Sequence, residues 1–173
     1  MKVEQIYTKC LAQGSYYIES NGEAVVIDPL RDVNEYIKLA KQSNSKIKYV
    51  VETHFHADFI SGHLTLANIT GADIIYGPNA DPEYAAIIAE DNQVFTFGSA
   101  SLTTIHTPGH TLESTSFLLK DEQGNEHSIF TGDTLFLGDV GIPDVAQRYK
   151  GVSKEELAGT LYDSVNNKIK NLP

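Results

Sequence analysis

Residues 52–63 read Glu52-Thr53-His54-Phe55-His56-Ala57-Asp58-Phe59-Ile60-Ser61-Gly62-His63. The mostly apolar residues 47–52 predict a short buried strand, and the stretch that follows breaks its periodicity as a loop does. His54 and His56 are two positions apart, so in an extended backbone their side chains point the same way. Imidazole nitrogens combined with the Asp58 carboxylate suit zinc or iron(II). The alternative is a solvated loop that carries these residues without a metal.

Two later segments repeat this placement of polar residues after a predicted strand. The first reads His106-Thr107-Pro108-Gly109-His110-Thr111, where the Pro-Gly turn aims His110 from a fixed backbone. The second reads Thr131-Gly132-Asp133-Thr134 and places a carboxylate at a strand end. A Gly-Asp pair is also common in ordinary turns. The three segments together, each after a strand, predict a metal site.

These segments carry a family resemblance. His54-x-His56-x-Asp58, Pro108-Gly109-His110 and Gly132-Asp133 resemble the metal signature of the metallo-β-lactamase superfamily. The longer strings 52–63 and 132–141 are similar to its persulfide dioxygenase branch, also called sulfur dioxygenases, including members fused to rhodanese domains. The similarity runs from about Tyr7 to the end of the chain. It implies an α+β fold, a four-layer αββα sandwich, and oxidation of a thiol persulfide by dioxygen to sulfite.

The resemblance also implies roles for the site residues. Two-metal hydrolases of the superfamily normally carry a histidine after the Asp of the first motif, whereas this chain has Phe59, which cannot bind a metal. The remaining set of two histidines and one carboxylate fits a mononuclear iron(II) oxygenase. By carry-over, one iron(II) per chain is held by His54, His110 and Asp133. His56 and Asp58 then orient water, ligands or substrate. The rival assignment makes His56 a fourth ligand, as in zinc enzymes.

Two other functions stay open. One is a zinc(II)-dependent thioester hydrolase resembling glyoxalase II (hydroxyacylglutathione hydrolase), and the other is a degenerate, non-catalytic metal-binding domain. Relatives of the dioxygenase branch usually read Gly-Arg-Pro-Asp where this chain has Gly141-Ile142-Pro143-Asp144. Their chains also continue past the position of Pro173, so we expect residues 1–173 to form one domain that is truncated at its C-terminus.

Local patterns predict the elements around the site. Asn21-Gly22 between β-rich runs is a strong hairpin signal. We expect helices that begin at an Asp32 N-cap, span residues 62–71 and span residues 82–90. Ser153 and Glu156 predict a capping box. The helix behind it carries an apolar stripe: Leu157, Leu161, Val165 and Ile169.

Composition excludes several classes of function. The formal net charge of −10 and the lack of a Lys/Arg cluster argue against a nucleic-acid partner. The apolar runs are too short for a membrane span. The polar start predicts no signal peptide and therefore a cytoplasmic protein. We expect small-molecule partners, a thiol persulfide and dioxygen, and leave a homo-oligomer and a rhodanese-domain partner or fusion open. The single cysteine, Cys10, is predicted to be a small core residue.

Overall fold

The computed structural model describes residues 1–143 and 151–172, so Asp144 lies outside the described residues. One sheet has six strands that lie side by side in chain order. They are β1 (Lys2–Thr8), β2 (Gln13–Ser20), β3 (Glu23–Ile27), β4 (Lys46–Val51), β5 (Asp73–Tyr76) and β6 (Ile87–Ile88). The first two pairings are antiparallel and those from β3 to β6 are parallel. Asn21 and Gly22 both have positive φ, at 47° and 82°, which confirms the predicted hairpin turn.

A second sheet packs against the first. Its four strands are antiparallel and lie in the order β10-β9-β8-β7. They are β7 (Val94–Phe97), β8 (Ala100–His106), β9 (Thr115–Lys120) and β10 (Glu126–Phe130). A 3-10 turn, η1 (Gly132–Thr134), follows β10 directly.

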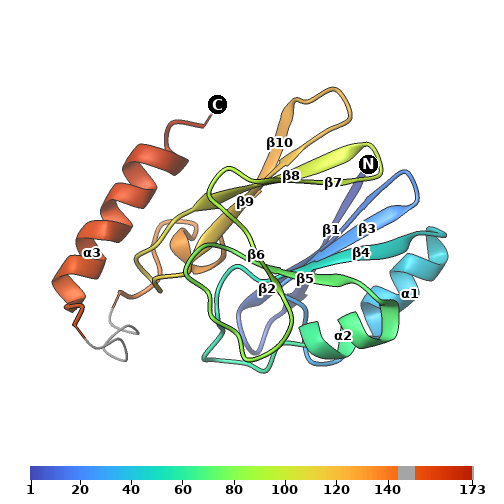
Figure 1. Cartoon of the computed structure of the whole chain (residues 1–173), viewed down its shortest axis with the longest axis horizontal. Coiled ribbons are helices and arrows are strands. Elements are labelled where there is room, and N and C mark those ends of the chain that lie inside the picture. The colour runs from blue at the N-terminus through green and yellow to red at the C-terminus, as the bar shows by residue number, and fades with distance from the viewer. Residues whose placement is uncertain (144–150, 173) are drawn as a thin grey trace.

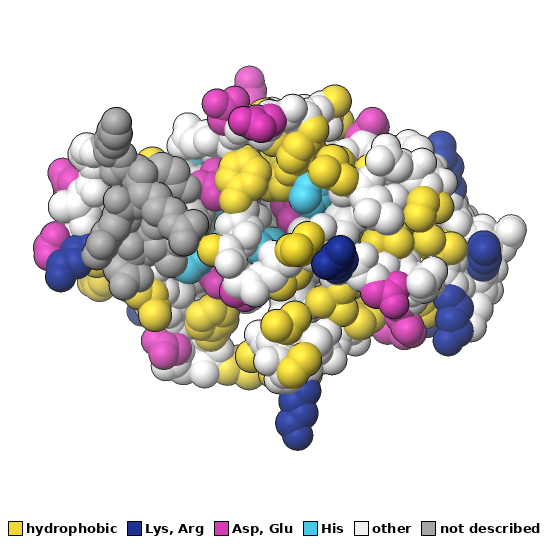
Figure 2. Space-filling view, turned by 90° about the horizontal axis from the view of Figure 1, so that it is seen from below, with side chains coloured by type: hydrophobic (Ala, Val, Ile, Leu, Met, Phe, Trp, Pro, Cys, Tyr) yellow, Lys and Arg dark blue, Asp and Glu magenta, His cyan; other side chains and the backbone are white. Residues whose placement is uncertain are grey.

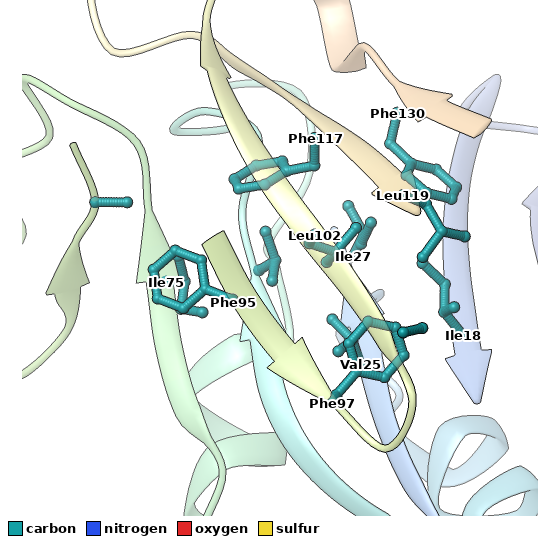
Figure 3. Close-up of a cluster of buried hydrophobic side chains, with 13 residues drawn as sticks. Ile18, Val25, Ile27, Ile75, Phe95, Phe97, Leu102, Phe117, Leu119 and Phe130 are labelled. Carbon is teal, nitrogen blue, oxygen red and sulfur yellow. The ribbon is translucent and has the colours of Figure 1, made fainter. Parts of the chain in front are cut away.

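The main core lies between the two sheets (Figure 3). Side chains alternate across β3: Val25 and Ile27 enter this core, while Ala24 and Val26 face the helices on the other side. The second sheet contributes fully buried Phe97, Phe117, Leu102 and Leu119 to the same core. Burial on both faces explains why residues 24–27 of β3 are all apolar rather than alternating.

The helices lie on opposite sides of the molecule (Figure 1). They are α1 (Asn34–Gln42) and α2 (His63–Thr70) beside the six-stranded sheet, and α3 (Lys154–Asp163), which continues into the π-helix η3 (Ser164–Ile169). The Ser153–Glu156 capping box is present as predicted, and the predicted apolar stripe of this helix is buried. The sandwich of sheets with outer helices is therefore confirmed.

Three local predictions are wrong. Residues 82–90 do not form a helix, because Ile87 pairs with Ile75 as strand β6, and sheet pairing overrides the local helical pattern. Asp32 is not the N-cap of α1: the cap residue is Val33, and the Asp32 carboxylate accepts the Asn34 N–H at 3.1 Å in a turn before the helix. Cys10 is exposed, in the turn between β1 and β2.

None of the helices among residues 1–143 and 151–172 is long and apolar enough to span a membrane.

Candidate metal centre

Loops from both sheets bring three of the predicted residues together. His54 follows β4, His110 lies in the loop after β8, and Asp133 lies in η1 after β10. Their donor atoms all lie within 4.8 Å of one another. The Oδ2 atom of Asp133 is 3.8 Å from His54 Nε2 and 3.5 Å from His110 Nε2. Donors about 2.1 Å from one tetrahedral ion lie roughly 3.4 Å apart, so the spacing suits a single ion.

Hydrogen bonds fix which nitrogen of His110 faces the cluster. Its Nδ1 lies 2.9 Å from the carbonyl oxygen of Ile142. A carbonyl can accept but not donate, so Nδ1 carries the proton and Nε2 keeps a lone pair directed at Asp133. Ile142 thus contributes its backbone, while its side chain is 63% exposed and takes no part in this contact.

The contact with Thr53 likewise decides which ring nitrogen of His54 carries the proton. The Thr53 hydroxyl donates to Asp28 Oδ2 at 2.8 Å, and it lies 3.0 Å from His54 Nδ1. A hydroxyl has one hydrogen, so Thr53 must accept from the Nδ1–H of His54, which leaves Nε2 free as a ligand atom. Burial and the nearby charge of His56 lower the pKa of His54 to about 3, so its ring is neutral, as a metal ligand must be.

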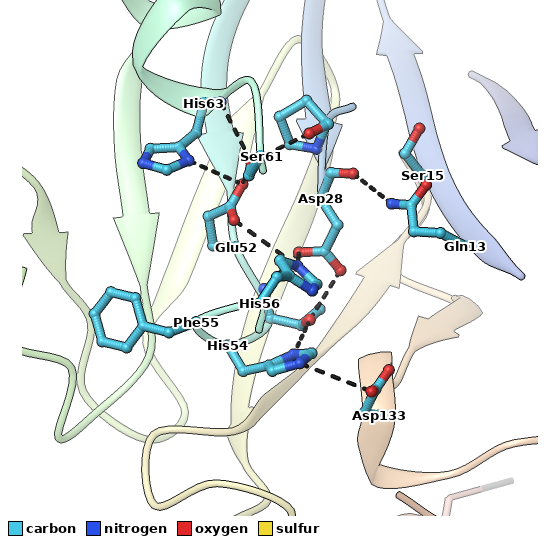
Figure 4. Close-up of polar contacts among 12 residues, drawn as sticks. Gln13, Ser15, Asp28, Glu52, His54, Phe55, His56, Ser61, His63 and Asp133 are labelled. Carbon is cyan, nitrogen blue, oxygen red and sulfur yellow. Dashed lines mark hydrogen bonds and ion pairs between the residues drawn. The ribbon is translucent and has the colours of Figure 1, made fainter. Parts of the chain in front are cut away.

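His56 lies beside His54, with ring centroids 4.2 Å apart, but its Nε2 points away from the three donors (Figure 4). The Nε2 atom of His56 is 3.1 Å from Asp28 Oδ1 and 3.8 Å from Glu52 Oε2. Both contacts are ion pairs and neither is a well-aligned hydrogen bond. Burial disfavours a charged ring here, but the Asp28 carboxylate outweighs it and raises the pKa of His56 to about 9. The opposite nitrogen, Nδ1, is 4.0 Å from Asp58 Oδ1. His56 therefore lies between the buried carboxylates of Asp28 and Glu52 and the exposed carboxylate of Asp58.

Asp28 and Glu52 form a buried acidic pair that the sequence reasoning missed. Asp28 accepts the Thr53 N–H at 2.8 Å as well as the Thr53 hydroxyl, and Glu52 accepts the Ser61 hydroxyl at 2.7 Å. Burial and the charge of Asp28 raise the pKa of Glu52 well above its usual range. Together with His56 these two residues also satisfy the spacing for a metal. Because both Asp28 oxygens already accept hydrogen bonds, we interpret the group as support for the histidine loop. The available signal was a carboxylate directly after the end of β3.

The turn that carries Asp133 packs tightly on this support. Gly132 has φ of +48°, and a Cβ there would lie 2.4 Å from the Thr53 hydroxyl oxygen. Only glycine avoids both the backbone strain and the clash. The Gly-Asp pair is thus more than an ordinary turn, since it brings Asp133 against the strand end that carries His54.

A cavity of about 770 Å³ is lined by one of the three donor residues, Asp133, and by neither His54 nor His110. Figure 2 shows histidine side chains surrounded by hydrophobic and acidic groups on this face. His56, Asp58 and Asp133 line its polar end, and the Phe59 ring stacks on His56 at 4.4 Å between centroids. The lining also includes a group of large, mainly apolar side chains: Tyr7, Leu11, Tyr16, Phe136 and Leu137.

The other histidines lie outside the donor set. His63 packs its ring on Tyr84 with centroids 5.2 Å apart, and its side chain is mostly buried. His106 Nε2 lies 2.9 Å from the Leu112 carbonyl and supports the loop of His110. His127 is exposed.

The chain is similar to known proteins. Residues 9–170 match the model of the metallo-beta-lactamase superfamily. The human persulfide dioxygenase ETHE1, mitochondrial, is 35% identical over 153 residues, which cover 87% of this chain and 55% of that protein. The cytoplasmic hydroxyacylglutathione hydrolase of Arabidopsis thaliana is 32% identical over 140 residues, which cover 78% of this chain and 54% of that protein.

A solved structure extends the likeness to the whole chain. The metallo-beta-lactamase from Staphylococcus aureus subsp. aureus COL matches with a TM-score of 0.88 and 36% identity, over 100% of this chain and 53% of that one. The chain thus spans about half the length of the curated relatives that it matches. The family model covers most of the sequence and the fold is shared, so the chain belongs to the metallo-β-lactamase superfamily.

Proposed function

We propose that this chain carries the mononuclear iron(II) site of a persulfide dioxygenase, which oxidises a low-molecular-weight thiol persulfide to sulfite and thiol. The observation that carries the proposal is the donor set of His54, His110 and Asp133, with Phe59 beside it. Two imidazoles and one carboxylate with open positions are typical of non-haem iron(II) oxygenases. Iron(II), when bound, supplies the redox chemistry by which dioxygen reacts with the persulfide sulfur.

Residues of this chain have separate tasks in the proposal. The reaction consumes persulfide, dioxygen and water and releases thiol, sulfite and two protons for each turnover. Asp58 and His56 line the polar end of the cavity, and we assign them to hold and move protons there. The apolar side chains of the same cavity bind the thiol part of the persulfide and exclude water from the reacting sulfur.

A zinc-dependent thioester hydrolase is the second candidate. The hydroxyacylglutathione hydrolase match, at 32% identity, and the retained Asp58 favour it. Phe59 argues against it, because its ring offers no donor atom to a second ion and packs on His56 instead. Without a second ion there is no metal-bridged water of the kind that two-metal hydrolases use.

One set of assays separates these candidates. Protein purified without oxygen from iron-supplemented cells is tested with glutathione persulfide and coenzyme A persulfide in an oxygen electrode, and with a thioester in a hydrolysis assay. We expect about one iron per chain, oxygen uptake and sulfite release. An Asp133→Asn variant serves as the inactive control. Two zinc ions per chain with thioester cleavage and no oxygen uptake would favour the hydrolase, and no metal or turnover would favour the degenerate domain.

A further inference from the structure

The C-terminal helices hold the segment that leads to His110. The Lys168 Nζ atom on η3 donates to the carbonyl of His106 at 2.6 Å and to Asp91 Oδ2 at 2.9 Å. The other oxygen of Asp91 accepts the backbone N–H of His106 at 2.7 Å. Both backbone polar groups of His106 are therefore fixed by this one charged pair. Hydrogen bonds to charged groups are stronger than those between neutral partners.

A second contact holds the next turn of the same segment. Ser164, at the start of η3 and almost fully buried, donates its hydroxyl to the Pro108 carbonyl at 2.7 Å. Gly109 then touches α3 directly: a Cβ there would lie 2.3 Å from the Leu161 Cβ atom, and its φ is +143°. The helix thus leaves space only for glycine at the residue before His110.

The contacts come from one helical face. Leu161, Ser164 and Lys168 are spaced three and four residues apart, which places them along one side of the helix. The π-turn is visible in the hydrogen bond from the Lys170 N–H to the Val165 carbonyl, five residues back. Both Leu161 and Val165 are buried, so this face is docked and not free in solvent.

We infer that Lys168 and Ser164 are positioning residues, which fix the backbone before His110 and so set the place of its Nε2 atom opposite Asp133. Among residues 1–143 and 151–172, the ring of His110 makes one hydrogen bond, to the Ile142 carbonyl. The backbone that carries His110 must therefore be held from elsewhere, and the helix face supplies donors to the carbonyls of Pro108 and His106, two and four residues before it. This inference rests on His110 being a metal ligand in the proposed function, and on neither iron nor persulfide oxidation.

The loop also has restraints that do not involve the helix. Thr107 Oγ1 lies 2.9 Å from Ser116 Oγ and 3.0 Å from Thr134 Oγ1. Loss of one helix contact should therefore shift the loop and not unfold it. Changes to groups that orient metal ligands typically lower metal affinity by about 10–100-fold, and we expect the lower part of that range.

The test compares Lys168→Met and Ser164→Ala with Lys170→Met. Lys170 is the matched control, since it directly follows η3 and its Nζ donates to the Asn166 side chain and not to the segment before His110. The measurements are the affinity for Co(II), from competition with a chelator, the visible absorption of the Co(II) form, and the melting temperature of the metal-free protein. Co(II) is the probe because its absorption reports ligand geometry.

We expect Lys168→Met and Ser164→Ala to weaken Co(II) binding about 10-fold and to change its spectrum, with Lys170→Met equal to the parent protein and Lys168→Arg close to it. If Lys168→Met fails to fold, Ser164→Ala and Lys168→Arg carry the comparison. A lower melting temperature with unchanged affinity and spectrum would overturn the inference, because it would show a purely structural contact. His110→Ala separates the two levels: if it still binds Co(II) normally, the ligand assignment in the proposed function fails; if it is empty while the helix variants bind normally, only the positioning role fails.

Discussion

The hydroxyl of Thr53 contacts both the buried carboxylate of Asp28 and the candidate metal ligand His54. It donates to Asp28 Oδ2 at 2.8 Å and accepts from His54 Nδ1 at 3.0 Å. A Thr53→Val substitution keeps the shape of the side chain and removes both contacts. The carboxylate of Asp28 and the ring of His54 then each lose a partner inside a buried site.

The expected cost follows from that burial. Thr53, Asp28 and His54 are at most 4% exposed, so water cannot replace the lost partners. Asp28 Oδ2 and His54 Nδ1 each lose a hydrogen bond. Each buried polar atom left unpaired costs about 1–3 kcal/mol, so the free energy of unfolding should fall by roughly 2–6 kcal/mol. His54 also loses the acceptor that fixes its proton on Nδ1, so we expect metal affinity to fall by about 10–100-fold.

Two measurements check this reasoning. Urea denaturation of the metal-free protein gives the stability, and competition with a chelator gives the affinity for zinc. Thr53→Ser keeps the hydroxyl and should behave nearly as the parent. Thr96→Val is the matched control on an exposed strand position. If Thr53→Val binds zinc and unfolds like Thr96→Val, the hydroxyl does not orient His54 and the proton counting is wrong.

Further predictions concern the ligands, the second-site position, the pH dependence and the core. Replacing His54 by Ala should empty the site, whereas His56→Ala should retain most iron and lose turnover by about 10–100-fold; equal emptying in metal analysis would support His56 as a fourth ligand. Phe59→His should raise the zinc content per chain, and an unchanged content would contradict the proposed loss of a second site. Burial opposes ionisation of Asp91, but the hydrogen bond from His106 and the Lys168 ammonium lower its pKa overall. The stabilisation is therefore present above the unfolded-state pKa and is lost as pH falls through the folded value, so acid titrations of stability should flatten in Asp91→Asn. Leu119→Ala, at a fully buried core position, should lower unfolding free energy in urea by about 2–5 kcal/mol, and a loss far below that would mean that the core repacks.

The sequence predicted the parts of the site that depend on short patterns. His54, His110 and Asp133 each follow a strand within a few residues, so strand ends alone bring them to one edge of the sandwich. The Asn21-Gly22 turn and the helix ending at Gly71 were predictable for the same reason, since their positive φ angles are set by residue type. The metal roles of these residues remain proposals.

The remainder depends on contacts between distant segments. Asp28 serves a loop that begins 25 residues later, and Lys168 reaches a carbonyl 62 residues away. No local pattern distinguishes Lys168 from an ordinary surface charge, and the one local signal for Asp28 is its position directly after β3. Residues 82–90 were predicted as a helix because the pattern there is helical, whereas pairing of Ile87 with the edge of the six-stranded sheet decides the structure.

The two sheets each contribute to the donor set, His54 from one and both His110 and Asp133 from the other. An ion bound by all three would act as a cross-link over the seam of the sandwich at its open end. At a free metal concentration about 100 times the dissociation constant, such a link adds about 2.7 kcal/mol to the folded state. Amide exchange at this end should then slow on loading with metal, while the hairpin ends far from the loops keep their rates. Loss of the ion would then remove this restraint from the cavity side of the seam alone.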